Sequence, residues 1–400
     1  MCKARRVPDV LQVAVDATPL LGVRTGVGMF CEGALSALAD RRDLSVRAYA
    51  VTWRRRHLLA PVLPAGVVAH QRAMPARPLH WAWGTLSAPP AEWFVGAVDV
   101  VHGTNFVVPP TRRAARVVTV HDLTAVRYPE LCDGPSLRFP DLVRRAMARG
   151  AWVHTPSQFV AEEVVAELGG DPERVRAVHH GVPLQRRSFA VIGEREREAV
   201  ELPAGVGRYV LAVGTVEPRK DLPGLVRAFD AVGADLPDVA LVLAGPDGWG
   251  TAALEQAMAA SRVRQRIIRL GYVSPAMLRR LLAGAAVLAY PSVYEGFGFP
   301  PLEAMAAGIP VVSTTAGALP EVLGDAAVLV PPGDPDALAA ALVAVLGEEG
   351  VRDELVARGR DRSARYTWEA CASGLAALYD AAASDSPARR PARAGSGRAR

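Results

Sequence analysis

The sequence predicts an α/β protein built from two doubly wound domains. Short apolar runs recur along the 400 residues, and amphipathic helical patterns separate most of them. A segment near the middle of the chain has neither pattern. Strands that alternate with helices predict βαβ units and parallel sheets. A chain of this length is sufficient for two domains of ordinary size, each with its own core.

The first domain is expected to span residues 1–190. Its strands are expected near Gln12–Asp16, Ser45–Val51, Val98–His102, Arg116–His121, Trp152–Thr155 and Val175–His179.

The second domain is expected to span residues 208–366. Its strands are expected near Tyr209–Val213, Ala240–Ala244, Arg266–Leu270, Val287–Tyr290, Val311–Ser313 and Ala327–Val330. Helical patterns cover Leu222–Ala231, Ala253–Ser261, Pro275–Leu282 and Asp336–Leu346.

The segment between the domains and the end of the chain have distinct compositions. Residues 191–207 alternate Glu with Arg and end in Pro-Ala-Gly-Val-Gly, which favours a linker. A helix is expected over 367–384. Residues 385–400 are rich in Arg, Ala, Pro, Gly and Ser, so they are expected to form a disordered basic tail.

Composition excludes several classes of protein. The formal charge is +5, and five arginines lie in the last dozen residues, so the remainder is near neutral and does not favour nucleic acid. The four cysteines have no zinc-ligand spacing. No apolar run of about 18 residues or more predicts a membrane span, and no signal peptide is recognisable. We therefore expect a cytoplasmic protein.

The most informative stretch is Tyr294–Gly308, which contains two carboxylates eight positions apart, Glu295 and Glu303. We expect a short helix with Pro301 at its first position, Glu303 in its first turn and Gly308 at its end. The backbone N–H groups before it suit a phosphate, and carboxylates suit ribose or sugar hydroxyls. The candidate backbone contacts are those of Gly296, Phe297, Gly298 and Phe299.

Adjacent basic residues follow another predicted strand. Arg219 and Lys220 come after Tyr209–Val213, and ligands of open α/β sheets bind beyond the carboxyl ends of strands. An Arg fork and a Lys ammonium can neutralise a leaving diphosphate. The simpler alternative is a solvated surface pair.

Two first-domain motifs lie at equivalent positions. His121 and Asp122 follow a Val-rich strand, and Asp122 is expected to orient His121 or cap the next turn. Gly26, Val27 and Gly28 are expected to let the backbone approach a phosphate, with a helix beginning near Met29. The loop is not a P-loop, because no Gly-Lys-Ser/Thr follows it. It is not the dinucleotide-binding fingerprint either, because Cys31 stands where the third Gly belongs.

These motifs resemble those of one family. The stretch with Glu295 and Glu303 resembles the signature of retaining GT-B glycosyltransferases of family four. Gly214–Leu222 resembles the family's diphosphate-binding loop, Thr119–Leu123 its active-site histidine segment, and Gly22–Gly28 its N-terminal Gly loop. The resemblance extends from about residue 12 to residue 370. Within the family, the chain is similar to the bacterial mannosyltransferase-like branch that builds cell-surface polysaccharides.

The resemblance implies a GT-B fold and transfer of a hexose from a nucleoside-diphosphate sugar to a glycan or lipid-linked acceptor, with configuration retained by front-face attack. GDP-mannose is the favoured donor and a UDP-sugar the alternative. It also implies that residues 1–190 form the acceptor-side domain and residues 208–366 the nucleotide-sugar-binding domain. The expected catalytic residues are His121, Glu295, Arg219 and Lys220, with Glu303 on the ribose and the helix 367–384 crossing back to the first domain. Leu302 belongs to the expected donor site, and Tyr272 and Val273 are expected at the nucleobase.

We expect no metal and no other cofactor, because Arg219 and Lys220 supply positive charge. Asp334-Pro-Asp336 imitates a D-x-D metal motif, but an N-cap role suits it better. Other histidines near strand ends, which are not expected to act directly, are His102, His154, His179 and His180.

Alternatives from other classes stay open at this point. They are a GT-B nucleotide-sugar epimerase and a non-catalytic nucleotide-sugar-binding protein; an NAD oxidoreductase shares the fold class but not the glycine fingerprint. Four tryptophans (Trp53, Trp81, Trp83, Trp93) lie near Arg54–His57, which fits peripheral membrane contact or, equally, scattered core and rim positions.

Overall fold

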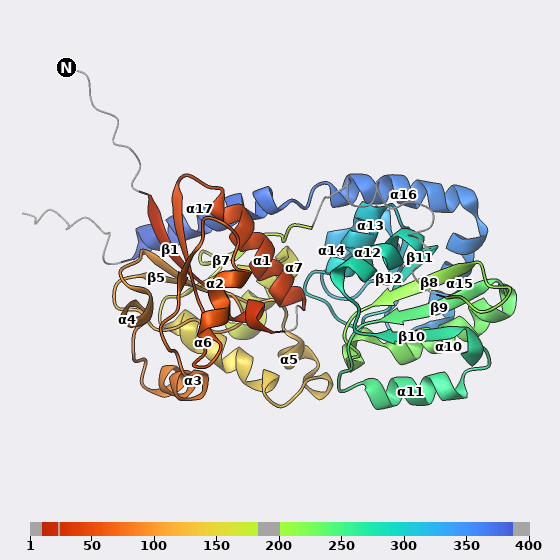
Figure 1. Cartoon of the computed structure of the whole chain (residues 1–400), viewed down its shortest axis with the longest axis horizontal. Helices are drawn as coiled ribbons and strands as arrows, with labels where there is room; N and C mark the ends of the chain where they lie inside the picture. Colours follow the sequence, from red (N-terminus) through yellow and green to blue (C-terminus); the bar gives the residue numbers. More distant parts are fainter. Residues whose placement is uncertain (1–9, 23–24, 183–200, 387–400) are drawn as a thin grey trace, which may run out of the picture.

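The computed structural model describes residues 10–22, 25–182 and 201–386, and it shows two α/β domains side by side (Figure 1). Each domain contains one parallel sheet with helices on both faces. Most of the predicted linker, and the tail from residue 387 on, lie outside the described residues.

The first sheet has the order β3-β2-β1-β4-β5-β6-β7. Its strands are β1 (Leu11–Asp16), β2 (Leu44–Tyr49), β3 (Val68–His70), β4 (Val100–Gly103), β5 (Ala115–Thr119), β6 (Trp152–Thr155) and β7 (Val175–Ala177). Its helices are α1 (Gly26–Ala39), α2 (Leu59–Val62), α3 (Ala76–Thr85), α4 (Glu92–Val95), α5 (Thr124–Arg127), α6 (Phe139–Ala148) and α7 (Gln158–Leu168).

The second sheet has the order β10-β9-β8-β11-β12-β13. Its strands are β8 (Arg208–Val213), β9 (Val239–Ala244), β10 (Ile267–Gly271), β11 (Val287–Tyr290), β12 (Val311–Thr314) and β13 (Val328–Val330). The helices that follow are α10 (Leu222–Asp235), α11 (Thr251–Ala260), α12 (Pro275–Gly284), α13 (Phe299–Ala307), α14 (Leu319–Leu323), α15 (Pro335–Gly347), α16 (Glu349–Ser363) and α17 (Trp368–Asp385).

The central strands β9 and β11 are apolar along their whole length, because both faces of the sheet are covered. Every residue of β9 and β11 is buried. These continuous runs explain why the sequence pattern located the central strands closely. The edge strand β3 was not predicted, since it is three residues long and half-exposed.

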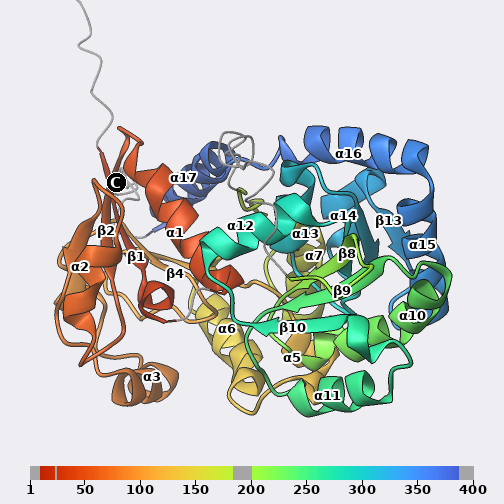
Figure 2. The same ribbon diagram turned by 45° about the vertical axis from the view of Figure 1, so that its right-hand side comes forward.

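Helix α17 returns to the first domain and lies along α1 (Figures 1 and 2). A Cβ on Gly33 of α1 would stand 2.1 Å from the Trp368 ring, so only glycine allows the helices to approach this closely. On the sheet side, Tyr379 hydrogen-bonds His102 of β4 at 2.7 Å. Asp385, which was predicted to begin the disordered tail, is the last residue of α17.

Candidate active site between the domains

Chain order reverses within each sheet between two neighbouring strands, β1 and β4 in the first domain and β8 and β11 in the second. Loops diverge at such a switch point and leave a crevice beyond the carboxyl ends of the strands. Three predicted motifs follow β1, β8 and β11, and the His121 segment follows β5, next to β4.

A charged cluster forms beyond β8 and β11. Arg219 and Lys220 lie in the short helical turn Pro218–Lys220, and both contact Glu295 of the loop after β11. The guanidinium Nη1 of Arg219 is 2.9 Å from Glu295 Oε2, and Lys220 Nζ contacts Oε1. Lys220 also donates to the Tyr290 hydroxyl at 2.6 Å. The structure therefore brings the adjacent Arg219 and Lys220 together with Glu295, which lies 75 positions after Lys220 in sequence.

Opposite charges within the cluster offset much of the cost of burying its ionised side chains. Burial raises the pKa of Glu295, but Arg219 and Lys220 outweigh it and hold that pKa at about 2. Burial lowers the pKa of Arg219, but Glu295 and Glu217 outweigh it and raise it well above its ordinary value. Burial and the neighbouring Arg219 lower the pKa of Lys220, against the attraction of Glu295. Lys220 is the only lysine among the residues that the structure describes.

Glu303 has the opposite environment. It lies in α13, partly buried, with no hydrogen bond or ion pair to any described residue, and burial raises its pKa to about 7. The prediction that it lies in the first helical turn is wrong, because α13 begins at Phe299, two residues before Pro301. Two consecutive prolines fit early helical positions, where their missing N–H groups cost no intrahelical bond. Gly308 ends the helix in the left-handed conformation, as predicted.

Glycines hold Glu295 against the first domain. A Cβ on Gly296 would lie 1.8 Å from the carbonyl oxygen of His121, so the two loops meet backbone to backbone. On the other side, a Cβ on Gly317 would lie 2.2 Å from the carbonyl oxygen of Glu295, and Gly317 has a φ of +58°. Any side chain at either position would push the Glu295 loop away from its neighbour.

His121 is held as a neutral imidazole. Its Nε2 donates to the carbonyl oxygen of Thr104 at 2.8 Å, which leaves Nδ1 as an acceptor. Burial lowers its pKa, against the hydrogen bond to Thr104 and the charge of Asp122. Asp122 does not orient His121. It caps the following turn, accepting from the backbone N and hydroxyl of Thr124 at 3.0 and 2.8 Å.

The N-terminal Gly loop reaches the second domain. Helix α1 begins at Gly26, three residues before the predicted start at Met29. A Cβ on Gly26 would be 3.5 Å from the ring of Phe299, so the two loops are in contact distance. Val27 lines the cavity between the domains, and Gly28 is buried.

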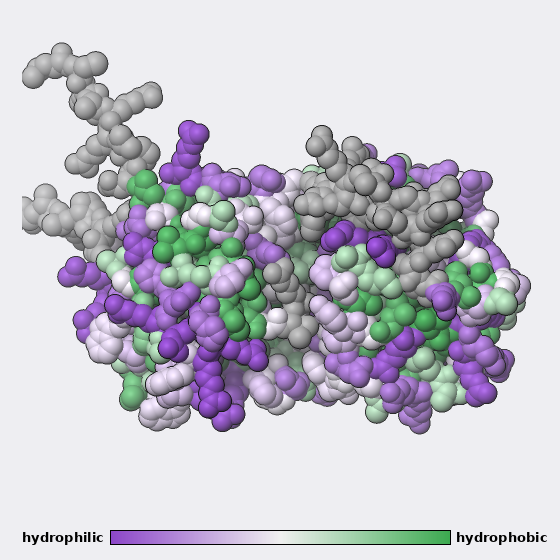
Figure 3. All heavy atoms as spheres, in the orientation of Figure 1, coloured by the Kyte–Doolittle hydropathy of each residue, from purple (hydrophilic) through white to green (hydrophobic). Residues whose placement is uncertain are grey.

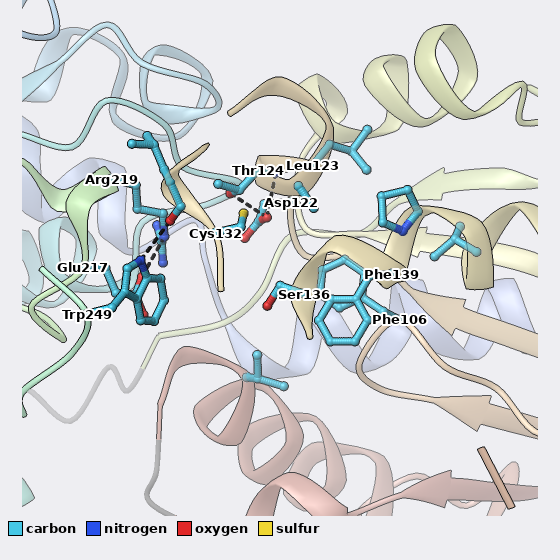
Figure 4. A pocket seen from close by; sticks show the side chains of 15 residues that line it. Phe106, Asp122, Leu123, Thr124, Cys132, Ser136, Phe139, Glu217, Arg219 and Trp249 are labelled. Carbon is cyan, nitrogen blue, oxygen red and sulfur yellow. Dashed lines mark hydrogen bonds and ion pairs between the residues drawn. The ribbon is translucent and has the colours of Figure 1, made fainter. Parts of the chain in front are cut away.

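The cavity between the domains has a volume of about 230 Å³ (Figure 4). Arg219, Glu217 and Trp249 line one side, and Asp122, Cys132 and Ser136 lie between them and the stacked rings of Phe106 and Phe139, whose centroids are 4.6 Å apart. The cavity thus combines a charged second-domain wall with an apolar first-domain wall, beside the charged cluster.

Specific bonds hold the two domains together around this cavity. Glu321 of α14 accepts from the backbone N of Gln158 and of Phe159 at 2.9 and 2.8 Å, which satisfies the first turn of α7. His179 Nε2 adds a bond of 2.7 Å to the same carboxylate. The Tyr294 hydroxyl accepts from Leu123 N at 3.0 Å and donates to Glu163.

Several predicted residues lie apart from the cluster. Leu302 is fully buried in the core, so its side chain does not reach the site. Tyr272 and Val273 follow β10, two strands from β8, and 59% of Tyr272 is exposed; their role at the nucleobase stays a prediction. Phe297 and Phe299 are buried against His180, which leaves only their backbone for a ligand.

Three further histidines are buried in the first domain. His102 and His154 share the hydroxyl of Thr119, at 2.7 and 2.9 Å, within the buried sheet. His180 stacks between Phe30 and Phe299. Asp334 caps α15 by accepting from Ala337 N at 2.9 Å, as predicted. Among the described residues, no group of three or more His, Cys, Asp or Glu is placed to hold a metal ion, and no helix has the length and apolarity to cross a bilayer.

Sequence reasoning missed several residues around the cavity. Glu217 pairs with Arg219 at 2.9 Å, and Trp249 donates to the carbonyl of Leu131 across the domains at 3.0 Å. Gly245 lies after β9, where a Cβ would be 1.8 Å from the carbonyl oxygen of Gly214. A glycine directly after a buried strand was the available signal for Gly245; nothing in the sequence pairs Trp249 with Leu131.

Comparisons with known proteins identify the family of the chain. Residues 207–348 match the family described as "Glycosyl transferases group 1", and residues 25–186 match "Glycosyltransferase Family 4". The O-antigen chain mannosyltransferase B of Escherichia coli is 30% identical over 287 residues, covering 70% of this chain and 74% of that protein.

Solved structures share the fold. The sucrose-phosphate synthase of Thermosynechococcus elongatus superposes with a TM-score of 0.72 at 20% identity, covering 93% of this chain and 98% of that chain. HepE of Anabaena, solved in complex with UDP and glucose, gives 0.69 at 16% identity, covering 93% and 100%. The chain therefore belongs to family four of the glycosyltransferases, the group 1 glycosyl transferases, and is a glycosyltransferase of GT-B fold.

Proposed function

We propose that the protein transfers a hexose, with mannose favoured, from a nucleoside-diphosphate sugar to a glycan or lipid-linked acceptor, with retention of configuration, in polysaccharide or glycoconjugate biosynthesis. The observation that carries the proposal is the charged cluster of Arg219, Lys220 and Glu295, with the unpaired Glu303 on the helix that follows. The similarity to an O-antigen chain mannosyltransferase supports mannose, so GDP-mannose is the favoured donor and a UDP-sugar the alternative.

Different residues of the site bind different parts of the donor. Arg219 and Lys220 bind the diphosphate, and their charge stabilises the leaving nucleoside diphosphate as the glycosidic bond breaks. Glu295 is held ionised, and it accepts hydrogen bonds from hydroxyls of the donor sugar. Glu303 accepts hydrogen bonds from the ribose hydroxyls, because a partly buried carboxylate with no partner among the described residues gains strongly from such donors.

Retention in this scheme needs no protein nucleophile. The acceptor hydroxyl attacks the anomeric carbon from the side of the departing diphosphate, whose oxygen takes the proton. His121 accepts a hydrogen bond from a sugar hydroxyl at Nδ1, the nitrogen that the Thr104 contact leaves unprotonated. It thereby orients the anomeric carbon.

We also propose that the reaction needs no metal ion and takes place in the cytoplasm, at the inner face of the cell membrane when the acceptor is lipid-linked. Two buried cations at the cluster supply the charge that a metal ion would otherwise provide. The apolar wall of Phe106 and Phe139 suits an acceptor with an apolar part.

The test is transfer of labelled sugar from GDP-mannose or UDP-glucose, with and without a polyprenyl-diphosphate-linked acceptor, followed by NMR of the product's anomeric configuration. We expect acceptor-dependent transfer with retention. Inversion would overturn the proposed mechanism. Conversion of the donor without an acceptor would favour the epimerase instead.

A further inference from the structure

One tryptophan of the second domain reaches the cavity between the domains. Trp249 lies in the loop between β9 and α11, and 50% of its surface is exposed. Its indole Nε1 donates to the carbonyl of Leu131 in the first domain at 3.0 Å, and the residue lines the cavity (Figure 4). The indole is thus fixed at its polar edge, while half of the residue stays open to solvent or to a ligand.

Two glycines seat Trp249 against the predicted diphosphate-binding loop. A Cβ on Gly248 would lie 2.5 Å from the carbonyl oxygen of Val216, and a Cβ on Gly250 would lie 3.1 Å from the same oxygen. The backbone N of Gly250 also donates to that carbonyl at 3.0 Å. Trp249 therefore has a fixed position relative to Arg219, which belongs to the same loop as Val216.

The opposite wall of the cavity is a pair of stacked phenylalanines. The ring centroids of Phe106 and Phe139 are 4.6 Å apart, and the rings are nearly parallel, at 4°. Phe106 has a φ of +57°, a left-handed conformation that is rare for a bulky residue, and its backbone N donates to the carbonyl of Thr119 at 2.9 Å. Its ring also packs edge-on against His121, with centroids 6.0 Å apart. The fold thus accepts a strained backbone that places an aromatic ring in the cavity wall beside His121.

Polar side chains complete the cavity between these aromatic walls. Asp122, Ser136 and Glu217 line it together with Arg219. Carboxylates accept hydrogen bonds from hydroxyl groups, whereas an isoprenyl chain would take them out of water without adding a partner. The volume of about 230 Å³ is below the roughly 300–1,000 Å³ of sites for drug-sized ligands, so the cavity suits a single ring.

We propose that the cavity binds the terminal pyranose of the acceptor glycan, with Trp249 on one side of the sugar ring and the Phe106–Phe139 pair on the other. The C–H groups on a face of a pyranose carry partial positive charge and pack on the electron-rich face of an aromatic ring. The hydroxyls of the sugar meet the carboxylates of the cavity. Trp249 thereby places part of the acceptor site on the donor-binding domain, so both domains contribute to acceptor binding.

The inference deepens the proposed function, because it rests on a sugar acceptor and names the ring that the cavity holds. It can fail separately, since sugar binding is measured without transfer. The full chain is mixed with methyl α-mannopyranoside, methyl α-glucopyranoside or methyl β-galactopyranoside, and saturation-transfer NMR records which protons of the sugar lie against the protein. We expect saturation of the ring C–H protons of at least one pyranoside.

Variants of Trp249 separate stacking from the contact between the domains. Trp249→Ala removes the ring and should weaken pyranoside binding roughly tenfold. Trp249→Phe keeps an aromatic face but loses the indole N–H, so it should restore most of the binding although the bond to Leu131 is gone. Phe139→Ala removes half of the opposite wall and should weaken binding as Trp249→Ala does.

Trp81→Ala is the matched control and should bind the pyranoside like the wild type. Trp81 is 64% exposed and lies in α3, outside the cavity. The region of α3, at the lower left of Figure 3, is covered by purple and pale residues. Binding of the nucleoside diphosphate, which should be retained in every variant, shows that each is folded.

Several results would overturn the inference. Pyranoside binding that is unchanged in Trp249→Ala would do so and would leave the proposed function intact if acceptor-dependent transfer is observed. Weakening of nucleotide binding by Trp249→Ala to the same extent as sugar binding would make the residue a support of the diphosphate-binding loop instead. Saturation transfer to geranyl phosphate and to no pyranoside would assign the cavity to the lipid part of an acceptor.

Discussion

Glu295 and Glu303 lie eight residues apart on one loop and helix, yet their surroundings shift them in opposite directions. Arg219 and Lys220 hold the pKa of Glu295 at about 2, whereas burial without a partner raises that of Glu303 to about 7. Glu295 is part of the folded protein's own charge balance. Among residues 10–22, 25–182 and 201–386, none forms a hydrogen bond or ion pair with the Glu303 carboxylate, and a ligand hydroxyl would supply a partner.

The difference indicates that one carboxylate of the site stabilises the fold and the other serves to bind the ligand. A carboxylate paired with two buried cations contributes to the fold, and its loss leaves those cations without compensation. A carboxylate buried without a partner costs stability until a ligand arrives. The same residue type thus has two consequences, and each can be tested by removing it.

The largest effect is expected for Glu295→Ala. Arg219 and Lys220 would stay buried without their carboxylate, so the free energy of unfolding should fall by about 3–5 kcal/mol, measured by urea denaturation at pH 7. Because its folded pKa of about 2 lies below the ordinary 4.5, the stabilisation is present above pH 4.5 and is lost as pH falls toward 2. Glu255→Ala removes an exposed ion-paired carboxylate and should cost about 1 kcal/mol at most.

Gly296→Ala tests whether the backbone places Glu295. The new Cβ would collide with the His121 carbonyl, so the loops should separate and the transfer rate should fall on the order of 100-fold. Gly350→Ala is the matched control, since no atom lies within 4 Å of a Cβ there. Equal rates for the two variants would show that the loop contact does not position the site.

Glu303→Gln should have the opposite sign from Glu295→Ala. The folded pKa of about 7 exceeds the ordinary 4.5, so the cost of ionising Glu303 appears as pH rises through 7. The variant should be more stable than the wild type by about 1–3 kcal/mol at pH 8 and little changed at pH 5. The exposed control Glu201→Gln should stay within about 0.5 kcal/mol of the wild type. A variant less stable than the wild type at pH 8 would contradict the unpaired state of Glu303.

Nucleotide affinity should share this pH dependence. Ribose hydroxyls donate to the ionised carboxylate, so binding of the nucleoside diphosphate should weaken as pH falls below 7 in the wild type and not in Glu303→Gln. Titration at several pH values measures this directly. Parallel pH profiles for both proteins would remove Glu303 from the ribose site.

The smallest effect is expected from metal removal. Since Arg219 and Lys220 supply the positive charge, dialysis against EDTA should leave the transfer rate unchanged. A loss of activity that Mg²⁺ or Mn²⁺ restores would refute this part of the proposal.

The sequence predicted the positions of the strands and helices around the site better than it predicted the contacts between their side chains. Fully buried strands such as Val287–Tyr290 and Trp152–Thr155 were predicted at their observed bounds, because both ends meet turn residues. The starts of α1 and α13 were misplaced, since glycine and consecutive prolines disguise a first turn. Pairings such as Lys220 with Glu295 join segments from different strands, and the pattern of one segment does not encode them.

The most direct test of the central claim, a nucleoside-diphosphate donor held between Arg219 and Glu303, is calorimetric titration with GDP, UDP, ADP and NAD. Wild type, Arg219→Ala and Glu303→Ala are compared at pH 8. We predict that one nucleoside diphosphate binds at micromolar strength and that both variants weaken it. Binding of NAD, with no nucleoside diphosphate bound, would contradict the account.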